Sequence, residues 1–234
     1  MAATIGGPRQ AGVLGVVGSP PGAGPTLPLV GDEGVGSDSG PFAVLIPVKA
    51  FHEAKARLAP TVGPPARAAL ARELADRVVD AAGPLPVAVV CDDDAVAAWA
   101  GGRGAEVVWR PGRGLNGAVE DGVTHLAAQG VGRVVVAHAD LPLAETFDGL
   151  LTDSGVVLVP DRHEDGSNVI VVPAAAGFRF HYGPNSFTHH QIEARRLGLD
   201  ITVVRSDRLC WDIDTPEDLL LPDHPVAAPL QAVR

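Results

Sequence analysis

Three aspartates have the residue type and spacing that suit a metal ion. Asp212 and Asp214 are two apart in "CWDIDTPEDL", so in extended backbone both side chains point to one side. Two carboxylates held together repel each other, and this favours a cation such as Mg²⁺, which takes carboxylate oxygens, waters and substrate phosphates. The alternative is that Asp214 caps the helix that follows. Two acids and a cap in this short stretch exceed what capping requires, so the pattern favours the metal.

Asp140 is the third of these acids, in the string "HADLP". It follows the apolar run "RVVVAHA", and Pro142 favours an extended exit from that predicted strand. An aspartate presented rigidly at a strand end is a natural ligand for a hard divalent cation. The spacing alone supports a helix N-cap equally well.

Three cations follow the first apolar run, "FAVLIPV". Lys49, Lys55 and Arg57 lie in "KAFHEAKARLA". A triphosphate requires cations and backbone N–H groups placed in this way, although a solvated basic loop is the alternative. The GxxxxGK[ST] pattern is absent, so this is no Walker loop.

Two further segments could bind an anion. "EDGSNVIVV" places Asn168 at the start of a predicted strand, and "FHYGPNSFTHH" runs from Gly183 into a helix predicted at Ser186. A helix N-terminus with a capping hydroxyl and a glycine approach is a ready anion site. Ordinary turn and cap chemistry explains the same residues.

Other site classes find little support. His138, His189 and His190 show no HxxxH spacing, and Cys91 and Cys210 are isolated, so we expect no zinc site. The GxSxG pattern of a serine hydrolase is absent. Two lone cysteines are expected to be reduced thiols, which fits a cytoplasmic protein.

Apolar runs alternate with helical patterns through most of the chain. This pattern predicts an α/β fold with a mixed, mostly parallel sheet covered by helices on both faces. Ligands of such sheets bind beyond the carboxyl ends of the strands. We expect strands at 42–48, 86–91, 105–110, 133–139, 155–160, 168–173 and 200–204, and helices at 64–82, 95–100, 114–130 and 186–197, with Ser186 as N-cap, and a last helix capped by Thr215.

Composition sets the outer limits. Residues 1–40 are rich in Gly and Pro and predict a disordered extension, followed by one domain at 41–222 and a tail at 223–234. The net charge of −10, without a Lys/Arg cluster longer than a pair, argues against a nucleic-acid partner. No apolar run reaches the roughly 18 residues that a membrane span needs. The oligomeric state is open, with a homodimer among the options.

Several strings, in order from Phe42 to about Leu221, resemble one known family. This is the guanylyltransferase family that activates 2-phospho-L-lactate or phosphoenolpyruvate in coenzyme F-420 biosynthesis. "KARL" and "DLP" also occur in related nucleotidyltransferases, whereas their combination with "YGPNSFTHH" is more specific. The matching strings are "IPVKAFHEAKARLA", "PGRGLNGAVEDG", "HADLPL", "DGSNVIVV", "HYGPNSFTHHQIEARRLG" and "DIDTPEDL".

The resemblance implies a Rossmann-like three-layer fold, similar to nucleotide-diphospho-sugar transferases and molybdenum-cofactor nucleotidyltransferases. It implies GTP as donor, a small phospho-acid as acceptor, release of pyrophosphate and Mg²⁺ as the metal. By this likeness, Lys55, Arg57 and Asp140 are catalytic. The implied binding residues are Lys49, Lys55, Arg57 and Asn116 for the nucleotide, Asn168, Gly183 and Ser186 for the acceptor, and Asp140, Asp212 and Asp214 for the metal.

Some alternatives stay open at this point. Another nucleotidyltransferase, acting on a sugar phosphate or on the molybdenum cofactor, is one, although the latter's glycine-rich signature is missing. A silent GTP-binding module of the same fold is another. The acceptor could be phosphoenolpyruvate, 2-phospholactate or 3-phosphoglycerate, and Asp92 or Asp93 is only a candidate reader of the base. Ala56 stands where the family commonly has a small hydroxyl residue.

Overall fold

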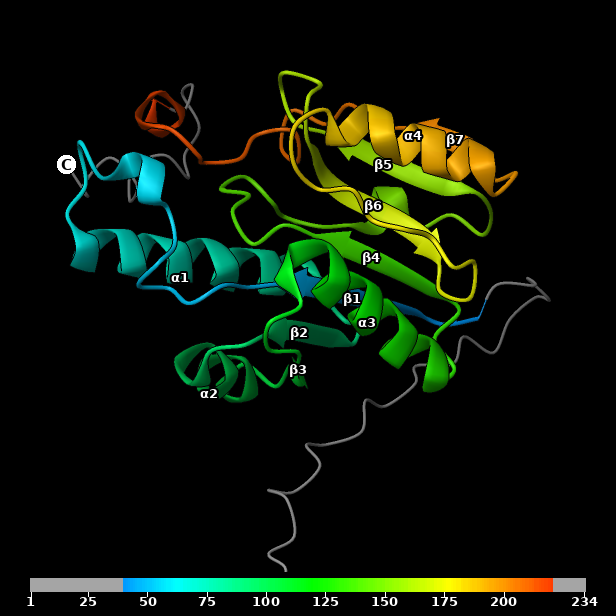
Figure 1. The fold of residues 1–234 in the computed structure, drawn as a ribbon, viewed down its shortest axis with the longest axis horizontal. Coiled ribbons are helices and arrows are strands. Elements are labelled where there is room, and N and C mark those ends of the chain that lie inside the picture. Colours follow the sequence, from blue (N-terminus) through cyan, green and yellow to red (C-terminus); the bar gives the residue numbers. More distant parts are fainter. Residues whose placement is uncertain (1–39, 221–234) are drawn as a thin grey trace, which may run out of the picture.

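A seven-stranded sheet forms the centre of the protein (Figure 1). The structure, a computed structural model, describes residues 40–220. The predicted tail, and all of the predicted extension except Gly40, lie outside the described residues. Along the sheet the strands follow the order β3-β2-β1-β4-β6-β5-β7. Their bounds are β1 Phe42–Pro47, β2 Val87–Cys91, β3 Glu106–Trp109, β4 Arg133–Ala137, β5 Val156–Pro160, β6 Ser167–Pro173 and β7 Ile201–Val203.

The direction of one strand distinguishes this sheet from a fully parallel one. β6 runs antiparallel to both of its neighbours, β4 and β5, whereas the other neighbouring strands pair in parallel. The predicted mixed, mostly parallel sheet is therefore confirmed. Because β6 is reversed, its first residues lie at the same edge of the sheet as the carboxyl ends of the parallel strands.

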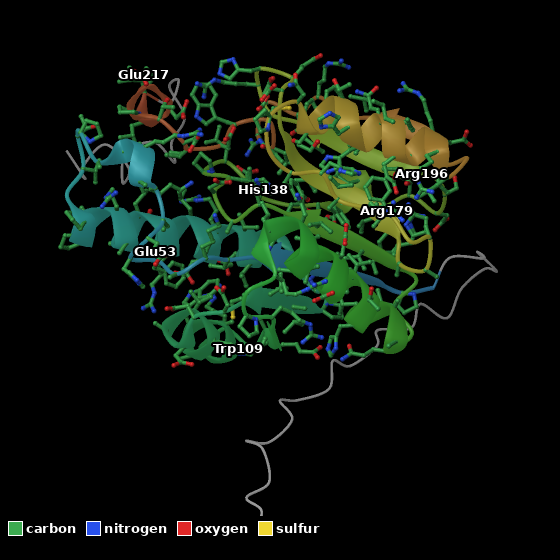
Figure 2. All side chains as sticks on the ribbon, in the orientation of Figure 1. Glu53, Trp109, His138, Arg179, Arg196 and Glu217 are labelled. Carbon is green, nitrogen blue, oxygen red and sulfur yellow. The ribbon has the colours of Figure 1, made fainter. Side chains whose placement is uncertain are left out.

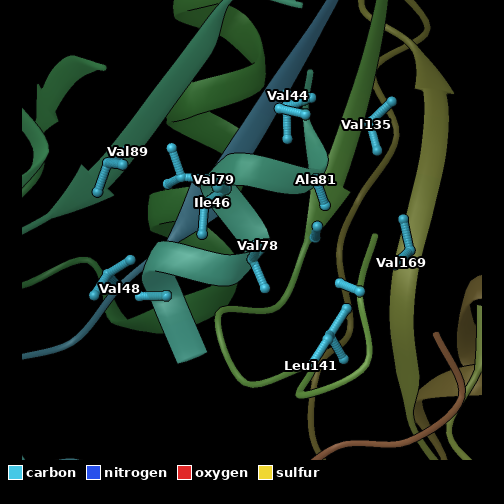
Figure 3. Packing of buried hydrophobic residues seen from close by; sticks show 14 of the residues in the cluster. Val44, Ile46, Val48, Val78, Val79, Ala81, Val89, Val135, Leu141 and Val169 are labelled. Carbon is cyan, nitrogen blue, oxygen red and sulfur yellow. The ribbon is translucent and has the colours of Figure 1, made fainter. Parts of the chain in front are cut away.

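Helices cover both faces of the sheet. On β1, Val44 and Ile46 pack toward α1 and α2, whereas Ala43 and Leu45 pack toward α3 and α4, as the alternation of a strand requires. Figure 3 shows part of the first of these layers, which includes Val44, Ile46 and Val78. Within residues 40–220, no helix combines the length and apolarity of a membrane span. The helices are α1 Pro64–Ala81, α2 Asp94–Gly102, α3 Gly114–Ala128 and α4 Ser186–Arg196, with 3₁₀ turns η1 Ala56–Leu58, η2 Asp148–Leu150 and η3 Pro216–Leu219.

The start of α4 differs from the prediction. Asn185, in left-handed backbone with φ 57°, occupies the cap position, and Ser186 is the first helical residue. The Ser186 hydroxyl is buried and instead accepts a hydrogen bond from the Ser167 backbone N–H at 3.1 Å. A tertiary contact therefore takes the side chain that sequence spacing assigns to the cap.

The last predicted helix is a 3₁₀ turn in the described part of the chain. Thr215 caps it, as expected, and Pro216 is its first residue. The cap is a reciprocal box, in which Asp218 accepts hydrogen bonds from the Thr215 backbone and hydroxyl.

An extended strip at residues 179–182 connects the end of β6 with α4. Its four successive backbone N–H groups donate to side chains that come alternately from α4 and α3. The acceptors, in order, are Glu193 (2.9 Å), Glu120 (3.1 Å), His190 (2.9 Å) and Asn116 (2.7 Å). Side chains of two helices thus satisfy a backbone that has no strand partner.

Candidate active site

Three segments meet at the carboxyl edge of the sheet, beyond β4. The His138 N–H donates to the Asn168 carbonyl at 3.0 Å, which joins the end of β4 to the start of β6. The Asn168 side chain donates to the Leu209 carbonyl at 2.9 Å, and the Ile213 N–H donates to the Asp140 carbonyl at 3.1 Å. These bonds hold the segment 209–214, far along the chain, against the strand ends.

A cleft of about 420 Å³ opens at this edge, between the loop after β1 and the residues that follow β4. We call it the charged cleft, because it gathers cations and acids from three segments. Lys49, Lys55, Arg57, Asp140 and Asp214 all line it, so five of the predicted site residues come together.

Lys55 makes the central contact of the charged cleft. Its ammonium lies 2.7 Å from Asp140 Oδ2 and donates to the Ile213 carbonyl at 2.5 Å. Only 10% of the Lys55 side chain is exposed. Its backbone is left-handed, with φ 57° and ψ 37°, which is uncommon for a residue other than glycine. Strain of this kind concentrates at functional sites, where surrounding contacts maintain it.

Two half-buried acids of this edge, Asp140 and Asp212, have opposite shifts of pKa. Burial opposes ionisation of Asp140, but the Lys55 charge and hydrogen bond outweigh it and lower the pKa of the Asp140 carboxyl. For Asp212, burial and then the negative charges of Asp140, Asp161 and Asp218 raise the pKa to about 6. Around Asp212, therefore, the negative charge of the neighbouring carboxylates outweighs the positive charge of Lys55.

The donor set suits a hard divalent cation. Asp140 Oδ1 is buried without a hydrogen-bond partner, so one oxygen of the Lys55-bound carboxylate remains available. Arg57 forms an ion pair with Asp214. Even so, no three His, Cys, Asp or Glu side chains converge on one point in the described part of the chain. The predicted three-aspartate metal site therefore stays a prediction. Asp140 and Asp214 line the same cleft, and the Asp140 charge contributes to the raised pKa of Asp212.

The other predicted residues lie outside the charged cleft. The Asn116 amide accepts from the Tyr182 N–H at 2.7 Å and donates to the Tyr182 carbonyl at 3.4 Å, so it holds the backbone of the strip. Asn168 and Ser186 are buried in internal hydrogen bonds, whereas Gly183 is exposed. These residues form a second group beside the cleft.

Sequence reasoning missed the residue that organises the segment 212–218. Asp218 is buried, and it accepts hydrogen bonds from the Asp214 N–H at 2.8 Å and the Thr215 N–H at 2.5 Å. It also forms an ion pair with Arg162, whose guanidinium lies over the Trp211 ring. The spacing Thr-x-x-Asp is the signature of a capping box and could have revealed it.

The structure also changes which residues are candidates for binding the nucleotide base. Asp93 accepts the Val96 N–H at 2.9 Å and thereby caps α2. Neither Asp92 nor Asp93 lines the charged cleft, whereas Glu53 does. Figure 2 shows Glu53 on the loop beside α1 and His138 closer to the centre of the molecule.

A second hollow, of about 650 Å³, lies beyond the segment 209–214. It is lined by three arginines, but each of them already has an acidic partner. The pairs are Arg162–Asp218, Arg205–Glu164 and Arg208–Glu145. In the charged cleft Lys55 and Arg57 are also paired with acids, but Lys49 forms no ion pair within residues 40–220, so that cleft retains a cation for a phosphate.

The charged cleft at the carboxyl edge of the sheet lies where α/β enzymes of the nucleotide-dependent class bind their ligands. The family model described as "Guanylyl transferase CofC like" matches residues 42–221, and the chain belongs to this family.

Curated relatives carry two related names. A phosphoenolpyruvate guanylyltransferase of Rubrobacter xylanophilus is 37% identical over 187 residues, which covers 76% of this chain and 91% of that protein. A 2-phospho-L-lactate guanylyltransferase of Methanothermobacter thermautotrophicus is 34% identical over 186 residues, covering 75% and 81%. Both names belong to the family that the sequence motifs indicated.

A solved structure agrees with the fold. A protein of Desulfovibrio desulfuricans G20, described as a nucleotide-diphospho-sugar transferase, superposes with a TM-score of 0.64. The match covers 82% of this chain and 94% of that one at 16% identity. This likeness confirms the predicted fold class.

Proposed function

We propose that the protein transfers GMP from GTP to the phosphate of phosphoenolpyruvate or 2-phospho-L-lactate, in coenzyme F-420 biosynthesis. The observation that carries this proposal is the charged cleft, in which Lys55 and Arg57 are each paired with a carboxylate at the strand edge. Membership in the guanylyltransferase family and the names of the relatives support it. A sugar-phosphate or molybdenum-cofactor substrate and a silent module are less favoured by those names.

The donor nucleotide would occupy the charged cleft. Lys49 and Arg57 are exposed and Lys55 lies deeper, so the three cations span the depth that a triphosphate would fill. Lys55 and Arg57 would take up the charge of the departing pyrophosphate, which develops as the bond to the α-phosphorus breaks.

The acceptor phosphate attacks the α-phosphorus in line, and pyrophosphate leaves. A new oxygen–phosphorus bond joins the acceptor phosphate to GMP, and the bond between the α- and β-phosphates breaks. Because the attacking phosphate oxygen is already anionic near pH 7, no general base is required. The chain's contribution is therefore to bind and align two polyanions.

Asp140, Asp212 and Asp214 would hold Mg²⁺. The unpartnered Asp140 Oδ1 and the carboxylate charges of Asp140, Asp161 and Asp218 that act on Asp212 both suit a bound divalent cation. When bound, the ion would neutralise part of the negative charge on the two substrates and so reduce their mutual repulsion.

The acceptor would lie against the second group of residues. Gly183 is exposed there, and the Ser186 hydroxyl, which accepts from Ser167, retains its own proton for donation to a phosphate oxygen. Asn168, whose side chain is hydrogen-bonded to the Leu209 carbonyl, would border the acceptor from the start of β6. We also place the reaction in the cytoplasm, which the free thiols of Cys91 and Cys210 support.

One experiment tests the proposal directly. The purified chain is incubated with Mg²⁺ and either GTP or ATP, together with phosphoenolpyruvate, 2-phospho-L-lactate or 3-phosphoglycerate, and released pyrophosphate is measured. We expect release with GTP and with one of the first two acids. Tight GTP binding without pyrophosphate from any combination would instead identify a silent nucleotide-binding module.

A further inference from the structure

His138 and Tyr182 stand out among the side chains that have a buried polar atom. Six buried side-chain polar atoms in residues 40–220 have no hydrogen-bond partner. Four belong to groups that are bonded through another atom: Arg67, Glu106, Arg133 and Asp140. The remaining two are His138 Nε2 and Tyr182 Oη, and neither side chain forms a hydrogen bond within the described residues.

Such a pair requires an explanation. A buried donor or acceptor without a partner has lost its bonds to water and gained nothing in return. Folded proteins therefore leave very few of them, and a ligand or an ordered water commonly completes those that remain. The two rings are in contact, with centroids 4.8 Å apart and planes at 49°, so the two unpartnered atoms belong to one cluster of side chains.

The pair lies between the two halves of the proposed site. His138 lines the charged cleft and is two residues from Asp140. Tyr182 directly precedes Gly183 of the acceptor group, and Asn116 holds its backbone. Phe180 stacks on the other side of Tyr182, at 5.8 Å and 11° between planes, which supports the ring in this place.

The chemistry of the pair selects an oxygen anion. Burial raises the pKa of the Tyr182 phenol well above its usual value, so the hydroxyl keeps its proton and donates. The imidazole Nε2 can also donate when it carries the ring proton. A protonated phenol is a poor ligand for a cation, and this argues against a metal at the same position.

We propose that Tyr182 Oη and His138 Nε2 bind the carboxylate of the phospho-acid acceptor. This inference rests on the proposed function, because it takes the acceptor phosphate to lie between Gly183 and the three aspartates. The carboxylate of such an acid is joined to the same carbon as the phosphate oxygen. An acceptor phosphate near Gly183 therefore leaves its carboxylate within reach of the neighbouring residue, Tyr182.

The test removes the phenol oxygen with Tyr182→Phe, which keeps the ring. Binding is measured by calorimetry with Mg²⁺ for two pairs of probes. Phosphoenolpyruvate is compared with vinyl phosphate, and 2-phospho-L-lactate with ethyl phosphate, which are the same compounds without the carboxylate. Thr202→Val removes an exposed hydroxyl from β7 and is the matched control.

We expect Tyr182→Phe to raise the Kd of the better-bound acid about tenfold and to leave the Kd of its carboxylate-free counterpart unchanged. The melting temperature of the ligand-free variant should equal or exceed that of the wild type, because an unpartnered hydroxyl has been removed. Thr202→Val should change neither Kd.

Three results would overturn the inference. They are an unchanged Kd for the acid, an equal loss for both members of a pair, and wild-type protein that binds no phospho-acid. An unchanged Kd with a lowered melting temperature would mean that an ordered water occupies the position. The binding assay needs no turnover, so a selective effect on the acid without pyrophosphate release would contradict the proposed function and leave this subsite standing.

Discussion

Replacement of Asp218 by Asn should weaken the fold and the proposed metal site together. The carboxylate accepts hydrogen bonds from the Asp214 and Thr215 backbones and from the Thr215 hydroxyl, and it pairs with Arg162. Asparagine keeps the shape but loses the charge. It can also direct an N–H group against backbone N–H donors, which cannot pair with it.

The size of the effect follows from burial. Only 5% of the Asp218 side chain is exposed, against 26% for Arg162, so the pair is buried on one side and partly solvated on the other. Breaking a fully buried pair costs about 3–5 kcal/mol, and solvation of Arg162 reduces this to roughly 2–4 kcal/mol of unfolding free energy. Misplacement of ligands by loss of such a supporting contact typically lowers metal affinity about 10–100-fold.

The effect should depend on pH in a defined direction. Burial opposes ionisation of Asp218, but hydrogen bonds from Thr215, Asp214 and Arg162 prevail and lower its pKa below the ordinary 3.8. A lowered folded-state pKa gives stability that is fully present above pH 3.8 and is lost as the pH falls through the folded value. The wild-type advantage should therefore be constant near neutral pH and shrink below 3.8.

Urea denaturation at neutral and acidic pH measures the first effect, and the Mg²⁺ dependence of pyrophosphate release measures the second. Glu217→Gln is the matched control, because Glu217 is the exposed neighbouring acid (Figure 2). If Asp218→Asn left both the denaturation midpoint and the Mg²⁺ requirement unchanged, the reasoning that Asp218 organises this segment would be refuted.

Three further substitutions test the charged cleft. Asp140→Asn should abolish pyrophosphate release while circular dichroism shows an intact fold, and near wild-type rates would remove Asp140 from the mechanism. Arg57→Ala should raise the KM for GTP yet change the unfolding free energy by less than about 1 kcal/mol, because its pair with Asp214 is exposed; a larger loss in urea would indicate a structural role. Glu53→Gln should lower the preference for GTP over ATP about tenfold, if its carboxylate reads the two adjacent N–H donors of guanine. Asp92→Asn is its control, and an equal effect of both would argue against Glu53.

The fold was largely predictable from the sequence. Continuous apolar runs such as Ala43–Ile46 are buried on both faces, and their alternation with helices is enough to predict a covered sheet. The reversal of β6 was not predictable from its own residues, because a strand buried on both faces has the same composition in either direction. The start of α4 was wrong for a related reason, since the Ser186 hydroxyl is used in a contact with a residue that is distant in sequence.

The candidate site was predictable where one segment carries its own signal. The Lys49–Arg57 loop and Asp140 follow strands directly, so their placement at one edge of the sheet follows from the strand pattern. Asn116 shows the limit, because its amide is occupied by the Tyr182 backbone, a partner that only the folded chain brings near. Unpartnered atoms such as Tyr182 Oη have no sequence signal at all, since burial and partners are properties of the structure.

The strip at residues 179–182 has a consequence for how such proteins diverge. Its position is determined by Asn116 and Glu120 on α3 and by His190 and Glu193 on α4, and no strand pairing holds it. Substitutions on two outer helices can therefore shift the proposed acceptor side of the pocket while the sheet and the proposed nucleotide side stay unchanged. Selection for a different small acid could act through these four positions, at a distance from the reacting atoms.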